Sequence, residues 1–143
     1  MKDLYNNVKL TRGLSPVVKT TDNTAWVSQI ADTAGFESLM FAGIIGTLTD
    51  ADMTVTFLAE EGDDSALADA ATVASASQLG SQTIGIQYDS DNQTFKWGYR
   101  GTKRYVRVTL TPAANTGDVY FAGIWVHGHP KTAPQTTQLV SGQ

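Results

Sequence analysis

Apolar and polar residues alternate with a period of two through the middle of the chain. The alternation is regular in four segments, which are Asp52–Glu60, Thr83–Tyr88, Thr94–Tyr99 and Arg104–Thr111. Successive side chains of a β-strand point to opposite faces of its sheet, so this period is typical of half-buried strands. Because the segments keep one phase, we expect a shared core: Met53, Val55, Phe57, Ile84, Ile86, Phe95, Trp97, Val106, Val108 and Leu110.

Two further segments, Phe36–Ile45 and Val119–Val126, are apolar on both faces. Such runs are typical of central strands that are covered on both sides, and a buried helix is the alternative. Gly43 and Gly123, among β-branched and aromatic neighbours, favour strands. Covering both faces in so small a chain takes a second sheet with loops or a neighbouring subunit, so we predict a homo-oligomer or symmetric assembly on a shell.

Turn signals separate these runs, and Thr94–Tyr99 and Arg104–Thr111 are close enough to pair around Arg100–Lys103. Another short strand is expected around Trp26, Ser28 and Ile30. The pattern predicts an all-β protein, an antiparallel β-sandwich of jelly-roll type. The alanine-rich stretch Ser65–Leu79 fits either a short helix or an edge strand with long loops.

The chain divides into an N-terminal arm (1–22), a β-sandwich domain (23–128) and an irregular, Pro-, Thr- and Gln-rich C-terminal tail (129–143). The arm is locally basic and too short for a stable isolated helix, so we expect it to be extended. It would then pair with a strand edge of another subunit or act as a swapped strand, and a frayed terminus is the alternative. The residues expected to contact the partner are Leu4, Tyr5, Val8, Leu10 and Arg12.

Composition narrows the class of partner. Of the 143 residues, only 17% are charged, below the usual ~25%, and the net charge is −4. The ten basic residues are scattered, so no nucleic-acid partner is expected. No apolar stretch approaches the ~20 residues of a membrane helix, and we expect neither a membrane partner nor a signal peptide. The absence of cysteine excludes disulfides and thiolate metal sites.

No motif predicts catalysis, a cofactor or a metal. The run Asp89–Asn92 begins like a calcium loop but lacks its later glycine and glutamate, so a tight turn is favoured. The acidic cluster Glu60–Asp64 is expected to be a solvated loop, with calcium as the less favoured reading. The pair His127 and His129 lacks a third metal ligand, so a strand end followed by a bend is favoured. Phosphate-binding loops, dinucleotide fingerprints and nucleophile elbows are missing, and we expect no enzyme activity.

The aromatic residues allow a sugar-stacking surface, although aromatics at alternating positions are more often core. Tyr105 differs, because it shares a face with Arg107 opposite Val106 and Val108. Tyrosine and arginine are enriched at contact hot spots, so we add Tyr105 and Arg107 to the candidate partner contacts.

Several sequence segments resemble segments of small structural proteins of tailed-phage and gene-transfer-particle heads, including head decoration proteins and head-spike base proteins. These segments are Phe36–Leu39, Val55–Phe57 with the acidic run Glu60–Asp64, Gly98–Val108 and Gly128–Pro130. The strand Lys103–Val108 is also similar to one in galactose-binding-like jelly rolls of the discoidin type.

The resemblance implies a non-enzymatic virion protein on the outside of the head, made in the bacterial host cytoplasm. Its partners would be the major capsid protein or other head proteins. The alternative is a carbohydrate-binding jelly-roll module of a phage spike or tail that contacts the host surface. Similarity of fold by itself does not transfer sugar binding to this chain.

Overall fold

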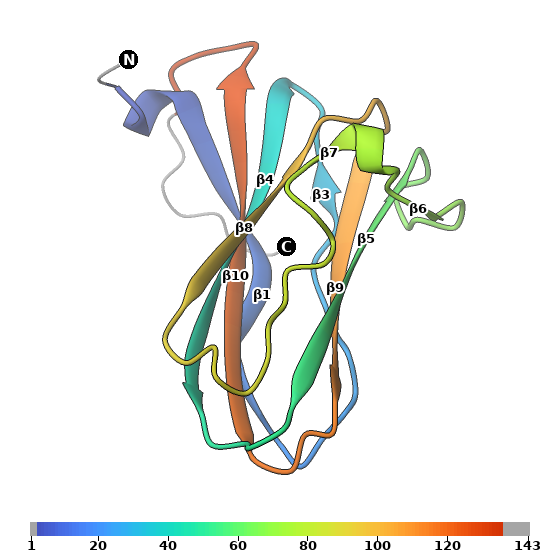
Figure 1. Ribbon diagram of the computed structural model, residues 1–143. Coiled ribbons are helices and arrows are strands. Elements are labelled where there is room, and N and C mark those ends of the chain that lie inside the picture. Colours follow the sequence, from blue (N-terminus) through green and yellow to red (C-terminus); the bar gives the residue numbers. More distant parts are fainter. Residues whose placement is uncertain (1–2, 136–143) are drawn as a thin grey trace.

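The computed structural model describes residues 3–135 and is a sandwich of two antiparallel β-sheets (Figure 1). Two short 3-10 helices, η1 (Tyr5–Asn7) and η2 (Ser75–Ser77), accompany the strands. The strands are β1 (Val8–Thr20), β2 (Trp26–Val27), β3 (Ala31–Asp32), β4 (Phe36–Leu48), β5 (Thr54–Gly62), β6 (Ala71–Thr72), β7 (Gln78–Leu79), β8 (Thr94–Tyr99), β9 (Tyr105–Ala113) and β10 (Asp118–Pro130).

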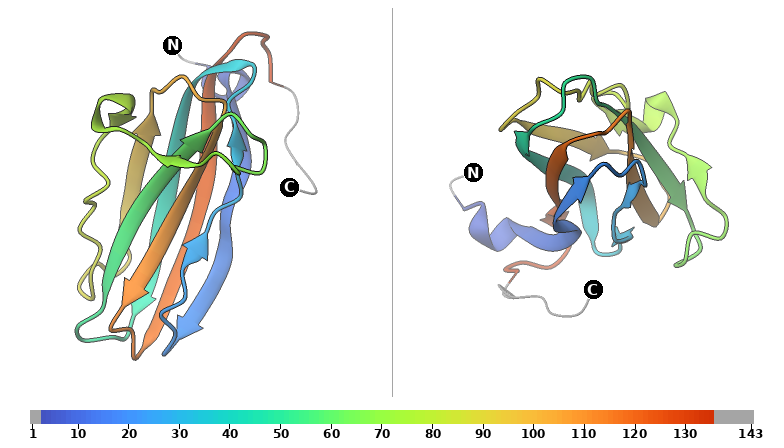
Figure 2. Two further views of the ribbon diagram at one scale, coloured as in Figure 1. Left: turned by 90° about the vertical axis from the view of Figure 1, so that its right-hand side faces the viewer. Right: turned by 90° about the horizontal axis from the view of Figure 1, so that it is seen from below.

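The first sheet has the strand order β1-β10-β4-β8-β7, and the second has β2-β9-β5-β6, with β3 also paired to β9. Figure 2 shows the two layers from the side and from below. This arrangement confirms the predicted all-β sandwich of jelly-roll type.

The core between the sheets is rich in aromatic rings. Trp97, Trp125 and Phe41 are fully buried, and the rings of Phe41 and Trp125 meet edge to face with centroids 5.0 Å apart. All ten predicted core residues lie here. Seven of them are buried, and Val55, Ile84 and Phe95 are partly buried against that core.

The N-terminal arm is extended, as expected, but it belongs to the sandwich. Its strand β1 pairs antiparallel with β10 of the same chain, from Val8 opposite Gly128 to Thr20 opposite Asp118. The expectation that its backbone pairs with another subunit is therefore wrong for the side that faces β10. Strand β1 satisfies the backbone hydrogen bonds along this edge of β10 from within the same chain. The pairing therefore does not incur the entropy cost of bringing in a second subunit.

The predicted tail begins inside the first sheet, because β10 continues through His129 to Pro130. Residues 131–135 leave the sheet and return to the N-terminal end, where the amide of Gln135 donates to the carbonyl of Asn6 at 2.8 Å. The remaining tail residues, 136–143, lie outside the described part of the chain.

One predicted strand and one predicted pairing are wrong. Thr83–Tyr88 is an irregular segment that touches β5 through a single bridge between Gln87 and Thr54. Gly85 has a φ of +76°, which interrupts the extended backbone although Ile84 and Ile86 still pack into the core.

Strands β8 and β9 do not form a hairpin, because β8 pairs with β4 and β9 with β5. The connection between them crosses from one sheet to the other. The Tyr99 hydroxyl holds this corner by accepting from the Lys103 amide at 2.9 Å.

The alanine-rich stretch contains no α-helix and forms edge strands with loops. Strand β6 pairs with β5, the 3-10 helix η2 follows, and β7 pairs with β8. The edge-strand alternative is thus the one the structure adopts.

Candidate docking surface

The outer face of the first sheet is the most unusual surface of the molecule. Opposed residues of antiparallel strands share a face, so the register defines rows across the sheet. One row runs Leu10, Val126, Met40, Gly98, Leu79; the next runs Arg12, Ile124, Ala42, Lys96; and the third runs Ala122, Ile44, Thr94. We call these three rows the outer face.

Large aliphatic side chains of the outer face are open to solvent. The exposed fraction is 58% for Leu79, 53% for Ile44, 51% for Leu10 and 42% for Ile124. Between them the small residues Ala42 and Ala122 leave a shallow hollow of about 610 Å³. Contiguous apolar surface of this kind marks interaction sites in soluble proteins.

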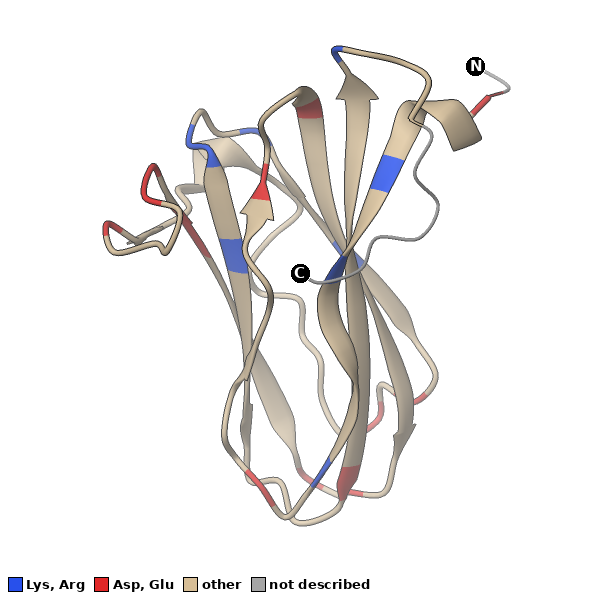
Figure 3. Ribbon diagram, turned by 180° about the vertical axis from the view of Figure 1, so that it is seen from behind, with Lys and Arg blue, Asp and Glu red and all other residues tan. Residues whose placement is uncertain are grey.

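The predicted central strands explain this face. Strands β4 and β10 are apolar on both sides and lie in the interior of their sheet, as expected. Their inner residues are covered by the second sheet, but Ile44 and Ile124 keep about half of their surface exposed. Residues 3–135 of one copy therefore do not cover both sides of these strands. Figure 3 shows the long stretches of these strands that carry no charged residue.

The outer face carries a cation. Lys96 stands at one end of the middle row, and the three rows contain no carboxylate. A second copy stacked face to face would bring together cations from both copies in an apolar contact. Burial of like charges without carboxylates is unfavourable, so this face is complementary to an apolar surface that carries acidic residues.

The seven candidate contacts do not form one site. Val8, Leu10 and Arg12 pair with outward-facing residues of β10 on the first sheet, and Leu4 and Tyr5 are exposed beside them at η1. Tyr105 and Arg107 lie on β9, in the second sheet.

Those two β9 residues have partners within the chain. Arg107 forms an ion pair with Glu60 at 2.7 Å, and the Arg104 guanidinium lies 5.1 Å from the centroid of the Tyr105 ring. This face is therefore more polar and internally paired than the outer face of the first sheet.

The two histidines point to different environments. His127 is buried, and its Nε2 lies 3.0 Å from the Thr11 hydroxyl. Burial, and to a smaller extent the positive charge of nearby Lys9, lower the pKa of His127 to about 4, so the ring is neutral at pH 7. His129 is exposed with a φ of +51°, and its Nδ1 lies 2.9 Å from the Ser38 hydroxyl.

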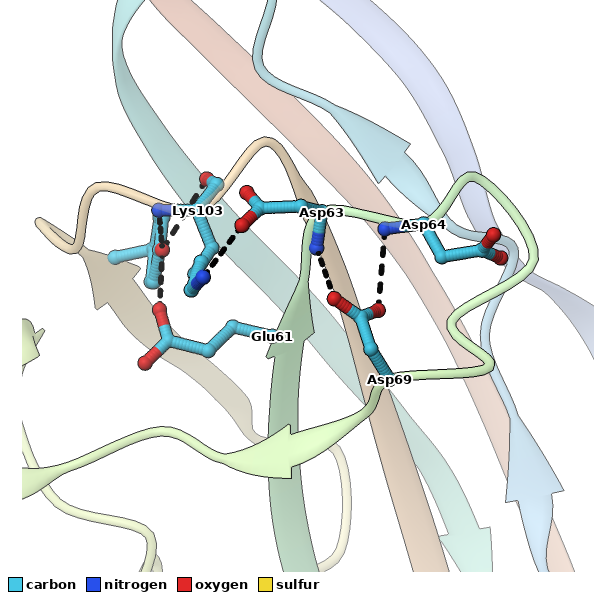
Figure 4. A network of polar contacts seen from close by, with 6 residues as sticks. Glu61, Asp63, Asp64, Asp69 and Lys103 are labelled. Carbon is cyan, nitrogen blue, oxygen red and sulfur yellow. Dashed lines mark hydrogen bonds and ion pairs between the residues drawn. The ribbon is translucent and has the colours of Figure 1, made fainter.

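The acidic cluster is a corner held by its own polar groups (Figure 4). The Asp69 carboxylate accepts from the amides of Asp63 and Asp64 at 2.8 and 3.1 Å. Lys103 pairs with Asp63, and the Tyr99 hydroxyl donates to Glu61. Desolvation, with that bond to Glu61, raises the pKa of Tyr99 well above its usual value.

Within residues 3–135, no group of three or more histidines and carboxylates is placed to hold a metal ion. The same residues include no helix long and apolar enough to cross a membrane.

The tryptophans give no support to a sugar-stacking surface, although Tyr88 and Tyr120 are exposed to 44% and 43%. Trp26, Trp97 and Trp125 are all buried, with at most 4% of their surface exposed. Tyr99 is also buried, and its hydroxyl belongs to the corner described above. Stacking on a sugar needs an open aromatic face, and the tryptophans have none.

Sequence reasoning did not single out Ile44, Ile124, Leu79 or Lys96 as contact residues. The signal for the first two was present, because they lie in the two runs that are apolar on both faces. Leu79 and Lys96 join them only through strand pairing, which no local pattern records.

The geometry defines an all-β sandwich with one exposed apolar sheet face. No family model and no curated protein matches the chain. Among solved structures it is similar to one of the N-terminal CBM22-1–GH10 modules of endo-1,4-beta-D-xylanase 10B from Clostridium thermocellum, complexed with xylohexaose. The identity is 9% and the TM-score 0.43, over 90% of this chain and 27% of that chain. So distant a likeness carries no argument about function.

Proposed function

We propose that this protein is a non-enzymatic structural protein on the outside of a tailed-phage head, which it joins through the outer face of its first sheet. It decorates or stabilises the capsid, or forms the base of a head spike. Its partners are the major capsid protein or other head proteins, and its location is the virion exterior after synthesis in the host cytoplasm. The exposed aliphatic rows of β1, β10, β4 and β7 carry this proposal, together with the resemblance of the sequence to head proteins.

The exposed apolar side chains provide a modest contact. Leu10, Ile44, Ile124 and Leu79 each expose about half of their surface. Full burial of such a side chain contributes about 1.5–3 kcal/mol, so covering the exposed half contributes about 1 kcal/mol each. A homo-oligomer that binds several sites of a repeated shell at once multiplies a modest contact of this size, because its copies are linked.

The positive charge of the outer face sets the mode of association. Lys96 disfavours two copies stacked face to face, whereas an acidic apolar shell surface pairs with it. Under this proposal the copies form a homo-oligomer or a symmetric array because the shell arranges them.

The test is co-sedimentation of purified protein with empty heads, using Ile44→Asp and Ile124→Asp as separate variants. Each places a carboxylate in the apolar contact, so we expect binding to weaken at least about tenfold. Val27→Asp is the matched control, because Val27 has the same exposed fraction as Ile44, 53%, and lies on β2 of the second sheet.

Circular dichroism and thermal unfolding establish that all three variants are folded. Equal binding of the two outer-face variants and the control, or no binding of the unchanged protein to heads, would contradict the proposal.

A further inference from the structure

A second feature lies on the side of the sandwich, where the wall of the second sheet is interrupted. Strand β2 pairs with β9 at Trp26 and Val27, and pairing resumes only at Ala31. In between, the amide of Gln29 donates to the carbonyl of Gly13 in β1, so this segment bridges the two sheets. The interruption leaves a hollow of about 420 Å³ between β1, β9, β10 and this segment, which we call the side hollow. That volume is in the range of small-molecule sites.

A buried polar group lines the side hollow. His127 is only 2% exposed, and its Nε2 is engaged with Thr11, but its Nδ1 has no hydrogen-bond partner in the described structure. In either tautomer of the neutral ring, Nδ1 can donate or accept one bond. Buried polar groups of native proteins nearly always have a partner, which can be an ordered water, so this atom calls for a partner beyond residues 3–135.

The side hollow also has an uncompensated positive charge. Of its three charged residues, Arg107 is paired with Glu60, and Asp32 is paired with Arg104 through two contacts of 2.9 Å. Lys9 forms no ion pair within residues 3–135, and its ammonium lies 5.9 Å from the centroid of the Phe36 ring. The sum over these five charged groups is one positive charge.

We propose that the side hollow binds a small organic molecule with one carboxylate, with Lys9 as its ion-pair partner and Val27 and Ile30 against its apolar part. The carboxylate supplies the missing negative charge beside Lys9, in the hollow whose wall contains His127. Val27 and Ile30 line the same hollow and provide apolar surface beside these polar groups. This site is independent of docking to a head, because it lies on the side of the sandwich and not on the outer face.

The test is a titration of the full chain with benzoate, followed by two-dimensional NMR of the backbone amides. We expect saturable shifts at Thr11 and Ser28, which line the hollow, and at least about tenfold weaker binding of benzamide, because it has the same shape without the charge.

Three variants make the assignment specific. Lys9→Gln should weaken benzoate binding about tenfold through loss of the charge-assisted bond, and Lys9→Arg should retain most of it. Lys131→Gln is the matched control, since Lys131 is an exposed lysine outside the hollow. The proposal is overturned if benzoate causes no saturable shifts at the hollow, if benzamide binds equally well, or if Lys9→Gln behaves like Lys131→Gln. No heads are present in this experiment, so a negative result does not contradict the docking proposal. A negative result in the co-sedimentation experiment likewise does not contradict the proposed ligand site.

Discussion

Replacement of Gly43 by alanine should destabilise the sandwich, because an aromatic ring occupies the space of the new methyl group. A Cβ at Gly43 would lie 2.3 Å from Cζ of Phe95, the residue directly opposite on β8. The Phe95 ring cannot swing away freely. It contacts the rings of Phe41, Phe57 and Phe121 at centroid distances of 6.1, 6.4 and 6.4 Å.

The magnitude follows from two opposing effects. Overpacking of a tight core costs about 1–3 kcal/mol, whereas replacing glycine by alanine restricts the unfolded chain and returns about 0.4–1 kcal/mol. We therefore expect Gly43→Ala to lower the free energy of unfolding by about 1–2 kcal/mol. For a chain of 143 residues this corresponds to a fall in Tm of roughly 3 °C per kcal/mol.

The assay is urea unfolding monitored by tryptophan fluorescence, with Gly98→Ala as the control. A Cβ at Gly98 would lie 3.1 Å from Cβ of Leu79, an exposed residue of a two-residue edge strand that has room to move. Gly98→Ala should therefore be neutral or slightly stabilising.

A double-mutant cycle with Phe95→Leu completes the test of Gly43. The smaller side chain removes the overlapping ring atoms, so the double variant should be more stable than the sum of the single changes by at least about 0.5 kcal/mol. Equal stability of Gly43→Ala and Gly98→Ala, or additive effects in the cycle, would refute this account.

Two further predictions concern acid stability. The Asp50 carboxylate ties two loops together by accepting five hydrogen bonds, from the amides of Asp52, Met53, Thr116 and Gly117 and from the Thr116 hydroxyl. These bonds lower the pKa of Asp50, so the stability that they provide is present above the unfolded pKa of ~3.9 and is lost as the pH falls below that value. Asp50→Asn should therefore flatten the acid part of a curve of Tm against pH, whereas Asp52→Asn should leave that part unchanged. The pKa of His127 is lowered to about 4 in the folded protein, so between about pH 6.5 and 4 only the unfolded chain binds the extra proton, and stability falls as the pH is lowered. His127→Phe should remove this dependence of Tm on pH. An unchanged dependence would show that another group titrates in this range.

The sequence by itself determined which residues enter the core. Alternation with a period of two is a local property of the extended backbone, so Phe57, Trp97 and Val108 could be assigned to the inside before any strand had a partner. The two runs that are apolar on both faces also predicted interior strands, because apolar side chains on both faces of a strand are typical of strands inside a sheet that is covered on both sides.

Tertiary structure alone decided which strands pair. Backbone hydrogen bonds are the same for every residue type, so no local pattern could show that β1 joins β10 of its own chain or that β8 and β9 separate into different sheets. The positive φ of Gly85 ended an alternation that the sequence continued through Tyr88.

The candidate sites needed the same long-range information. Leu79, Gly98, Met40, Val126 and Leu10 form one row only because five strands meet in a particular register. The side hollow exists only where the wall of the second sheet is interrupted beside a buried histidine. Composition and spacing are properties of the chain taken in order, whereas both surfaces are made by residues that folding brings together from distant segments.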